Sequence, residues 1–266
     1  MIPATIPFVK AHGARNDFLL TWRSELPANA GNPVDLSQAI CNRYTGVGAD
    51  GWIILDDAAG ADAAIELWNS DGSRSEISGN GTRCAAALLV KQGRASSPEI
   101  RIATGAGPKT LRLLDRKDNA FSFEMNMGQA KVEELQCRLV PGREAVILNV
   151  GNPQIAIFTG DFDFDWRTLG AQLERHPHFP NRTNVSFVRV VDDHTLDVRF
   201  FERGAGETMS SGTGSTGAAA AAMARGHVTS PVRILTPAGP LDIRQVGEEL
   251  LLAGPAEITV GGEFYL

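Results

Sequence analysis

The sequence predicts an α/β (α+β) protein of two pseudo-symmetric halves, each a curled mixed β-sheet wrapped around a central α-helix. Two Ser-Gly-x-Gly turns begin at Ser78 and Ser211, and each opens an alanine-rich segment that ends at a glycine, Gly93 or Gly226. The interval between the two glycines is the same as the interval between the two serines. Apolar runs flank both segments. The chain therefore repeats one unit of sheet and helix.

The alanine-rich segments, residues 85–90 and 218–224, are the predicted central helices. Alanine has the highest helix propensity and little bulk, which suits a helix that strands approach closely. We expect each helix to end at its glycine, because glycine readily adopts the left-handed backbone that closes a helix.

Strands are predicted where β-branched and aromatic residues gather or alternate with polar ones. A local repeat, RIATGAG at 101–107 and RILTPAG at 233–239, predicts a closing strand after each helix, and Asn16 and Asn152 each precede another apolar run. We assign residues 1–118 to an N-terminal half, 119–258 to a C-terminal half and 259–266 to a strand that returns to the first half. The other predicted strands are residues 52–55, 121–127, 145–150, 185–191 and 196–201.

Composition and charge exclude several functional classes. A chain of 266 residues with 43% hydrophobic content can bury real cores. A net charge of −6 without a basic stripe argues against nucleic acid, and no run approaches the roughly 18 apolar residues of a membrane helix. Three cysteines cannot all pair, and the first residues do not resemble a signal peptide, so we expect free thiols and a cytoplasmic protein. His176 and His178 flank a proline and are expected at the surface, so no metal and no cofactor are predicted.

The glycine-rich turns are the predicted ligand site. The first N–H groups of a helix have no intrahelical acceptor, and the helix dipole favours an anion there. Glycine weakens a helix start unless the backbone must approach something closely. Two such turns in register therefore indicate that Ser78 and Ser211 face one small molecule. The simpler alternative is that both serines only cap their helices, a role that serine fills well.

Residues 212–217, Gly-Thr-Gly-Ser-Thr-Gly, match the dinucleotide-binding fingerprint. That fingerprint requires a strand immediately before it and an acidic residue about 20 positions later. Residues 232–239 contain no acid, and the preceding strand is expected to end eight or more residues earlier. We therefore reject nucleotide binding. Ser211 and Ser215 also lie outside any G-x-S-x-G motif of a serine hydrolase.

Several further blocks together resemble the diaminopimelate epimerase family, the cofactor-independent amino-acid racemases and epimerases. They occur in the family's order along the whole chain. The resemblance implies a diaminopimelate epimerase-like fold, an amino-acid substrate bound between two halves, a pyridoxal-phosphate-independent isomerase of lysine biosynthesis, and commonly a homodimer. The blocks are HGARNDF (12–18), CNR (41–43), GVGADG (46–51), NSDGS (69–73), GNGTRC (79–84), GNP (151–153) and ERGAGET (202–208).

The resemblance also implies which residues bind the substrate. Arg203 suits a distal carboxylate, because its planar guanidinium can donate two parallel hydrogen bonds. Backbone amides at the two helix starts would bind the carboxylate at the reacting carbon, and these belong to Gly79, Asn80, Gly212 and Thr213. The other substrate-binding residues carried over from the family are Asn16, Asn69, Asn152, Asn184 and Glu202.

The chain departs from the family at the residues that move the proton. The family uses two cysteines, one as thiolate and one as thiol, where this chain has Ser78 and Ser211. A free thiol has a pKa near ~8.5, whereas a serine hydroxyl is a weaker acid even than tyrosine at ~10. A family histidine is replaced by Gln154, which cannot exchange protons. A family glycine is replaced by Arg15, and Thr216 stands where many relatives have cysteine.

Three hypotheses follow. The first is an isomerase with altered chemistry, in which Ser78, Ser211 and Glu202 are the catalytic candidates and Glu202 is the base, because burial can raise a carboxyl pKa. The second is a non-catalytic amino-acid-binding paralogue. The third is an epimerase engineered with serines to trap its substrate, which the further changes at Gln154, Arg15 and Thr216 disfavour. The residues leave the first two open, together with the side chain of the ligand and the pathway.

Overall fold

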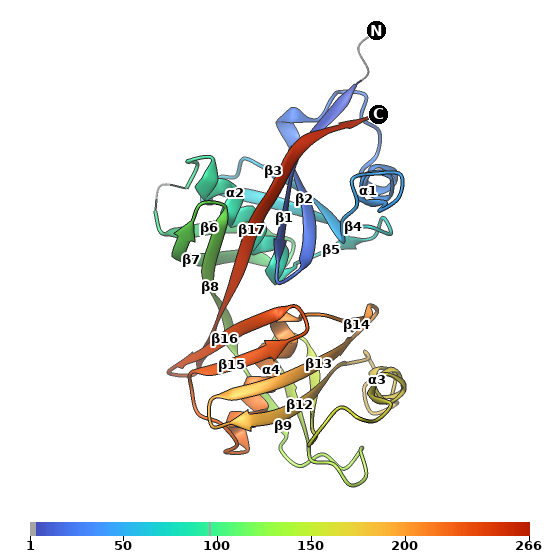
Figure 1. Ribbon diagram of the computed structural model, residues 1–266, viewed down its shortest axis with the longest axis vertical. Helices are drawn as coiled ribbons and strands as arrows, with labels where there is room; N and C mark the ends of the chain where they lie inside the picture. Colours follow the sequence, from blue (N-terminus) through green and yellow to red (C-terminus); the bar gives the residue numbers. More distant parts are fainter. Residues whose placement is uncertain (1–3, 96) are drawn as a thin grey trace. The chain divides into compact units, whose positions relative to one another are not determined.

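The computed structural model describes residues 4–95 and 97–266 and divides into two compact units (Figure 1). One unit comprises Met1–Met125 with Gly254–Leu266, and the other comprises Asn126–Ala253. Both divisions fall inside strands, namely β8 (Ala120–Gln129) and β17 (Glu249–Tyr265). The end of β17, red in Figure 1, pairs antiparallel with β1 (Thr5–Gly13) in the first unit.

The first unit is one mixed sheet with two helices. The pairs β2–β3 and β4–β6 are parallel, and the pairs β1–β2, β3–β4, β4–β5, β6–β7 and β7–β8 are antiparallel. In chain order its remaining elements are β2 (Asn16–Trp22), the 3-10 turn η1 (Arg23–Glu25), α1 (Pro33–Cys41), β3 (Gly51–Asp56), β4 (Ala63–Asn69), β5 (Arg74–Ser75), α2 (Gly79–Lys91), β6 (Glu99–Thr104) and β7 (Gly107–Lys117).

The second unit repeats this pattern. Its pairs β11–β12 and β13–β15 are parallel, and β9–β10, β10–β11, β12–β13, β13–β14, β15–β16 and β16–β17 are antiparallel. The predicted duplication is therefore confirmed. The elements are β9 (Lys131–Glu134), β10 (Ala145–Asn149), β11 (Pro153–Phe158), α3 (Trp166–Glu174), β12 (Asn184–Asp192), β13 (Thr195–Glu202), β14 (Gly206–Thr208), α4 (Gly212–Ala224), β15 (Val232–Thr236) and β16 (Gly239–Val246).

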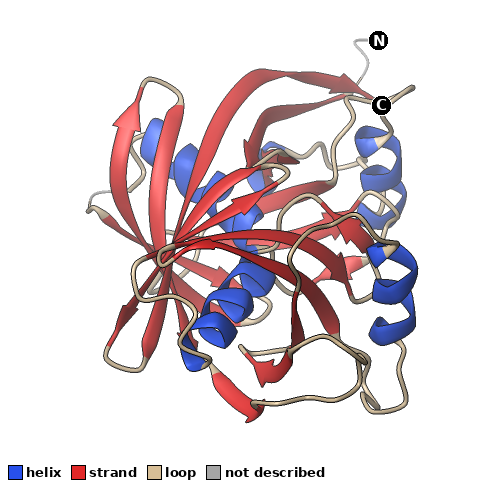
Figure 2. Ribbon diagram, turned by 60° about the horizontal axis from the view of Figure 1, so that its bottom comes forward, coloured by secondary structure: helices blue, strands red, loops and turns tan. Residues whose placement is uncertain are grey.

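In each unit the sheet curls around one alanine-rich helix, as the strands around the helices in Figure 2 illustrate. Helix α2 contacts β1, β2, β3, β4 and β6, and α4 contacts β10 to β13 together with β15 and β16. The alanines at 85–87 and 218–222 are all buried. Their small side chains let strands approach on every side of the helix axis, as the sequence predicted.

Both central helices end as predicted at their glycines. Gly93 has φ +68° and Gly226 has φ +74°, in the left-handed region. The amide of Gly93 donates to Val90 O at 3.2 Å and that of the next residue donates to Leu89 O at 2.9 Å. Gly226 and the residue after it make the same two bonds, which satisfy carbonyls at the end of α4.

Two further helices, α1 and α3, were not predicted. They are separated along the chain by the same interval as the two serine turns. Helix α1 contacts β3 and β4, and α3 contacts β12, β13 and β14. Helix α1 packs with Trp52 and Ile54, and α3 packs with Phe187. A signal for α1 was present, because Asn32 caps it and Pro33 begins it, the residue types favoured at those two positions.

A short strand, β14, lies closer to the glycine-rich turn at Gly212 than the sequence predicted. Strand β14 ends at Thr208, only a few residues before α4, so the strand preceding the glycine turn does not end eight or more residues earlier. Residues 232–239 still contain no acidic side chain for a ribose. The rejection of nucleotide binding now rests on that second reason alone.

The three cysteines, Cys41, Cys84 and Cys137, are free and buried. His178 is exposed and His176 is half-buried. Within residues 4–95 and 97–266, no three histidine, cysteine or acidic side chains gather as metal ligands would. No helix in that part of the chain has the length and apolarity needed to cross a membrane.

The start of α4 is packed so tightly that even an alanine at position 214 should destabilise the protein. A Cβ there would lie 2.8 Å from Phe200 Cδ1, whereas a Cβ at Gly212 would meet nothing closer than Leu252 Cδ1 at 3.7 Å. We expect Gly214→Ala to lower the free energy of unfolding by about 1–3 kcal/mol through overpacking. Gly212→Ala, in the same turn, should change it by less than about 1 kcal/mol. Urea unfolding of both variants measures the difference, and equal losses would contradict it.

Candidate functional site

The two central helices begin with the same cap. Ser78 Oγ accepts the Gly81 amide at 3.1 Å, and Ser211 Oγ accepts the Gly214 amide at 3.0 Å. Both serines therefore cap their helices, as the simpler alternative expected. The caps leave the first two amides of each helix without an acceptor among the described residues. These amides belong to Gly79, Asn80, Gly212 and Thr213.

The Ser211 hydroxyl also donates a hydrogen bond to a carboxylate. Its partner is Glu202 Oε2 at 2.7 Å, and Thr208 Oγ1 donates to the other oxygen, Glu202 Oε1, at 2.6 Å. Burial raises the pKa of Glu202, and the two hydroxyl hydrogen bonds oppose this rise. A carboxylate with a raised pKa is a stronger base than an ordinary glutamate, so Glu202 is suited to accepting a proton.

Ser78 has no such partner. Glu202 is the last residue of β13, and the last residue of the matching strand β4 is Asn69. The side-chain nitrogen of Asn69, Nδ2, donates to Ser73 Oγ at 2.9 Å. Among the residues that the structure describes, no carboxylate is bonded to the Ser78 hydroxyl. The two serine turns therefore share a backbone geometry but differ in the charge beside them.

Asn152 lies at the start of α4 together with Gln154. Asn152 Nδ2 contacts Thr213 Oγ1 at 3.4 Å, and Asn152 Oδ1 accepts from Gln154 Nε2 at 2.7 Å. Gln154 is buried, and its Cγ lies 3.3 Å from where a Cβ at Gly217 would be. Its Oε1 is buried without a hydrogen-bond partner in the described residues. Gln154 therefore orients Asn152 against the helix.

A hydrogen bond joins the Asn184 side chain to the backbone of Arg203. Asn184 Oδ1 accepts the Arg203 amide at 3.0 Å, and Asn184 Nδ2 donates to Pro153 O at 3.0 Å. The Arg203 side chain is exposed and donates to Asn181 O at 3.1 Å. Within the described chain it forms no ion pair, so Arg203 is not part of a surface salt bridge. Its guanidinium keeps donors for an anion.

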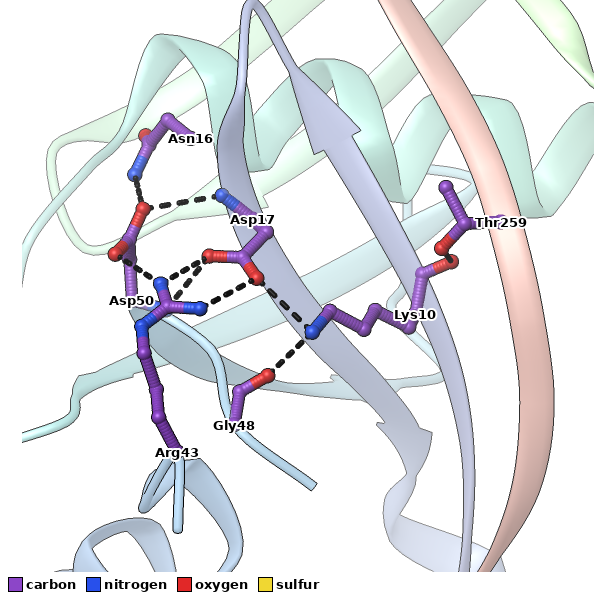
Figure 3. Close-up of polar contacts among 7 residues, drawn as sticks. All are labelled: Lys10, Asn16, Asp17, Arg43, Gly48, Asp50 and Thr259. Carbon is purple, nitrogen blue, oxygen red and sulfur yellow. Dashed lines mark hydrogen bonds and ion pairs between the residues drawn. The ribbon is translucent and has the colours of Figure 1, made fainter. Parts of the chain in front are cut away.

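In the first unit, Asn16 is held by a network of charged side chains (Figure 3). Asn16 Nδ2 donates to Asp50 Oδ2 at 2.7 Å. Arg43 pairs with both Asp50 and Asp17, each at 2.8 Å, and Lys10 pairs with Asp17 at 3.0 Å. Burial disfavours the Asp17 charge, but hydrogen bonds from Arg43 and Lys10 bring its pKa below the usual value. The network fixes the Asn16 side-chain amide at the start of β2.

Arg15, which the resemblance places where the family has glycine, lies in the turn between β1 and β2. Its φ is +60° and that of Ala14 is +49°, so a side chain occupies backbone that favours glycine. Arg15 is exposed. It therefore adds a positive charge to the surface beside Asn16.

The sequence missed several residues that hold the site. Thr208 binds Glu202, as described above. The Glu174 carboxylate is buried, accepts the Gly204 amide at 3.2 Å and pairs with Arg182, and so holds the turn that follows Arg203. A signal was available only for Thr208, because it closes the ERGAGET block that was assigned to the site. Glu174 comes from α3, which was not predicted.

Comparison of the sequence with known proteins identifies its family. The profile described as diaminopimelate epimerase matches residues 8–133 and 146–259. The diaminopimelate epimerase of Pelotomaculum thermopropionicum is 35% identical over 274 residues, covering 97% of this chain and 98% of that protein. That of Xanthomonas campestris pv. campestris is 36% identical over 280 residues, covering 97% and 95%.

Solved structures support the same fold at lower identity. A phenazine biosynthesis protein of the PhzF family from Bacillus anthracis superposes with a TM-score of 0.75 at 13% identity, covering 98% of this chain and 99% of that one. A hydroxyproline epimerase from Agrobacterium vitis gives a TM-score of 0.70 at 16% identity, covering 99% and 93%. Because its sequence matches these relatives over nearly its whole length and its fold agrees, this chain belongs to the diaminopimelate epimerase family.

Proposed function

We propose that this chain is a cofactor-independent amino-acid isomerase of lysine biosynthesis that binds diaminopimelate or a related amino acid and moves its α-proton slowly. The relatives named diaminopimelate epimerase support the reaction class. The observation that carries the proposal is the 2.7 Å hydrogen bond from Ser211 to Glu202, a carboxylate with a raised pKa at the start of α4.

The proposed reaction begins when Glu202 removes the α-proton, either directly or through the Ser211 hydroxyl. In the second route Ser211 gives its proton to Glu202 Oε2 as it takes the proton from carbon. The electron pair left on carbon delocalises into the α-carboxylate, whose negative charge is stabilised by amides at a helix start. Inversion then needs a proton from the opposite face. Ser78 is the family-derived candidate for that role, but a hydroxyl without a basic partner is slow to give and regain a proton.

Substrate recognition in this proposal uses both helix starts on one ligand, as the family resemblance implies. The amides of Gly79, Asn80, Gly212 and Thr213 would bind the carboxylate at the reacting carbon. Arg203, with donors uncommitted to any carboxylate of the described chain, would bind the distal carboxylate. Four asparagines would bind the remaining polar groups of the substrate, or hold the protein backbone that binds them. These are Asn16, Asn69, Asn152 and Asn184.

A non-catalytic amino-acid-binding protein is the second candidate. It is favoured by Ser78, whose hydroxyl has no basic partner among the described residues, and by Gln154, which cannot exchange a proton. This candidate uses the same binding residues and differs only in turnover. Homodimer formation and a cytoplasmic location stay predictions for both candidates.

One experiment on the unmodified protein tests the proposal. Binding of LL-diaminopimelate is measured by calorimetry, and α-deuterium incorporation in D₂O is followed by mass spectrometry over hours. We expect binding, and incorporation that is slow but faster than in the enzyme-free control. Binding without incorporation would establish the second candidate. Failure to bind LL-diaminopimelate or any amino acid of a panel would overturn both, and rapid incorporation would overturn the slow proton transfer.

A further inference from the structure

Arg83 is a cation enclosed in the core of the first unit. Its side chain is 0% exposed and forms no ion pair with the described residues. Nε donates to Pro255 O at 3.1 Å, Nη2 donates to Asn80 Oδ1, and Nη1 is buried without a partner. Burial lowers the pKa of Arg83 to about 10, so the guanidinium stays protonated near neutral pH. A buried charge of this kind is costly unless something compensates it.

The charge lies next to the start of α2. Arg83 follows Gly79 by four residues on the same helix face, and helical side chains lean toward the N-terminus. A Cβ at Gly79 would be 4.0 Å from Arg83 Nη1. A helix start is itself positive, so a cation there is unfavourable without an anion nearby. The first unit therefore concentrates two positive features at the amides of Gly79 and Asn80.

Arg83 also begins a hydrogen-bond chain of defined polarity. Arginine can only donate hydrogen bonds and the Asp50 carboxylate, which pairs with Arg43, can only accept them, so Arg83 and Asp50 fix the orientation of the two amides between them. Asn80 turns its carbonyl to Arg83 and its Nδ2 to Asn16 Oδ1 at 3.2 Å. Asn16 turns its Nδ2 to Asp50 Oδ2 at 2.7 Å. The side-chain nitrogens of Asn80 and Asn16 each retain one N–H group that has no acceptor among the described residues.

The start of α4 has the opposite character. The residue that corresponds to Arg83 is Thr216, which donates to Gly212 O of its own helix at 2.8 Å. The Ser211 cap donates a hydrogen bond to the Glu202 carboxylate. The two helix starts are thus alike in backbone and opposite in local charge.

We infer that Arg83 is a positioning residue for carboxylate binding at the start of α2: it supplies the uncompensated positive charge and, through Asn80, holds the amides of Asn80 and Asn16 as donors. This inference rests on the proposed function, because it assigns one end of the proposed amino-acid ligand to one helix start. It also predicts that this half of the site accepts an anion and rejects an ammonium group.

Binding of LL-diaminopimelate to Arg83→Met, Arg83→Lys and Leu88→Ala variants tests the inference. Leu88→Ala is the matched control, because Leu88 is buried in the same helix at 2% exposure and its apolar side chain makes none of the hydrogen bonds that link Arg83 to Asp50. We expect Arg83→Met to weaken binding by about 10–100-fold, the range of a charge-assisted hydrogen bond. Arg83→Lys should regain part of the affinity, because it restores the charge without the fork. Leu88→Ala should bind within about twofold of the wild type despite lower stability. Equal affinities of Arg83→Met and Leu88→Ala would overturn the inference and leave the proposed function intact.

A measurement without ligand distinguishes failure of the inference about Arg83 from failure of the proposed function. If the wild type binds no amino acid, the proposed function fails, and nuclear magnetic resonance of the Asn16 and Asn80 side-chain amides still decides on Arg83. These signals should be dispersed and slow to exchange in the wild type and in Leu88→Ala, and should exchange at least about tenfold faster in Arg83→Met. Unchanged signals in Arg83→Met would overturn the inference. Should that variant not fold, Arg83→Gln replaces it, because a neutral glutamine can donate or accept and so no longer fixes the Asn80 amide. Unchanged Asn16 and Asn80 signals in Arg83→Gln would equally overturn the inference.

Discussion

Replacing Ser78 and Ser211 by cysteine, together with Gln154→His, should raise the rate of α-deuterium incorporation into LL-diaminopimelate by about three orders of magnitude or more. The pKa of a thiol is ~8.5 and falls further at a helix start, whereas a serine hydroxyl is a weaker acid than tyrosine at ~10. Each unit of pKa corresponds to about tenfold in rate when it is fully expressed in the transition state. Mass spectrometry of the amino acid after incubation in D₂O measures the gain.

The geometry favours this restoration. A thiol at position 211 would stand beside Glu202, which the Ser211 hydroxyl reaches at 2.7 Å. A histidine at position 154 would lie against Gly217, where the Gln154 side chain now packs. The cost is in capping, because replacing a serine cap destabilises a helix by about 0.5–2 kcal/mol. The matched control, Ser78→Ala with Ser211→Ala and Gln154→His, loses the same caps and should gain no rate.

A triple cysteine and histidine variant that binds LL-diaminopimelate but exchanges no faster than the wild type would contradict this expectation. The obstruction would then lie elsewhere, and Arg15 is the first residue to change. Arg15 occupies left-handed backbone at φ +60°, so Arg15→Gly removes both its charge and its strain.

Substituting Glu202 by glutamine should lower the residual exchange rate of the wild type by about 100-fold or more, the typical contribution of a general base. Glutamine keeps the size of the side chain but cannot accept the proton. Glu207→Gln is the matched control, because Glu207 lies in the same hairpin and pairs with Arg167 at the surface. Exchange in the control should equal that of the wild type, and equal rates in Glu202→Gln would exclude Glu202 as the base.

The raised pKa of Glu202 gives this prediction a pH dependence. The proton acceptor is the ionised form, so wild-type exchange should increase as pH rises through the raised pKa and then level. The contribution of Glu202 to the free energy of unfolding changes with pH in the opposite direction, because the folded state binds the Glu202 proton more tightly than the unfolded chain. Stability from this group is present below the unfolded pKa of ~4.3 and lost as pH rises through the folded value. Thermal unfolding of Glu202→Gln from pH 4 upward should lack this loss, and identical pH profiles of both proteins would contradict the assignment.

The sequence by itself determined the architecture of this protein, because the signals involved are local or periodic. The repeated serine turns, the alanine-rich helices, the closing glycines at 93 and 226 and the five strand runs are properties of short segments. All occur where they were predicted, except that the strand predicted at 145–150 ends at Asn149. Family blocks then indicated which residues to place in a site, and the assignment of those residues to substrate binding stays a prediction. Helix α1 was missed although its signals, Asn32 and Pro33, are also local.

Only the tertiary structure decided what surrounds each candidate residue. Ser78 and Ser211 open the same kind of turn, yet Ser211 lies beside a carboxylate and Ser78 caps the helix that carries a buried cation. These differences arise from contacts between distant segments, such as Asn80 with Asn16 across 64 positions and Arg83 with Pro255 across 172. Hydrogen-bond partners, desolvation and the resulting pKa of a group depend on the whole fold around it. A repeat in the sequence therefore predicts two equivalent backbones, whereas the packing around them sets two different electrostatic environments.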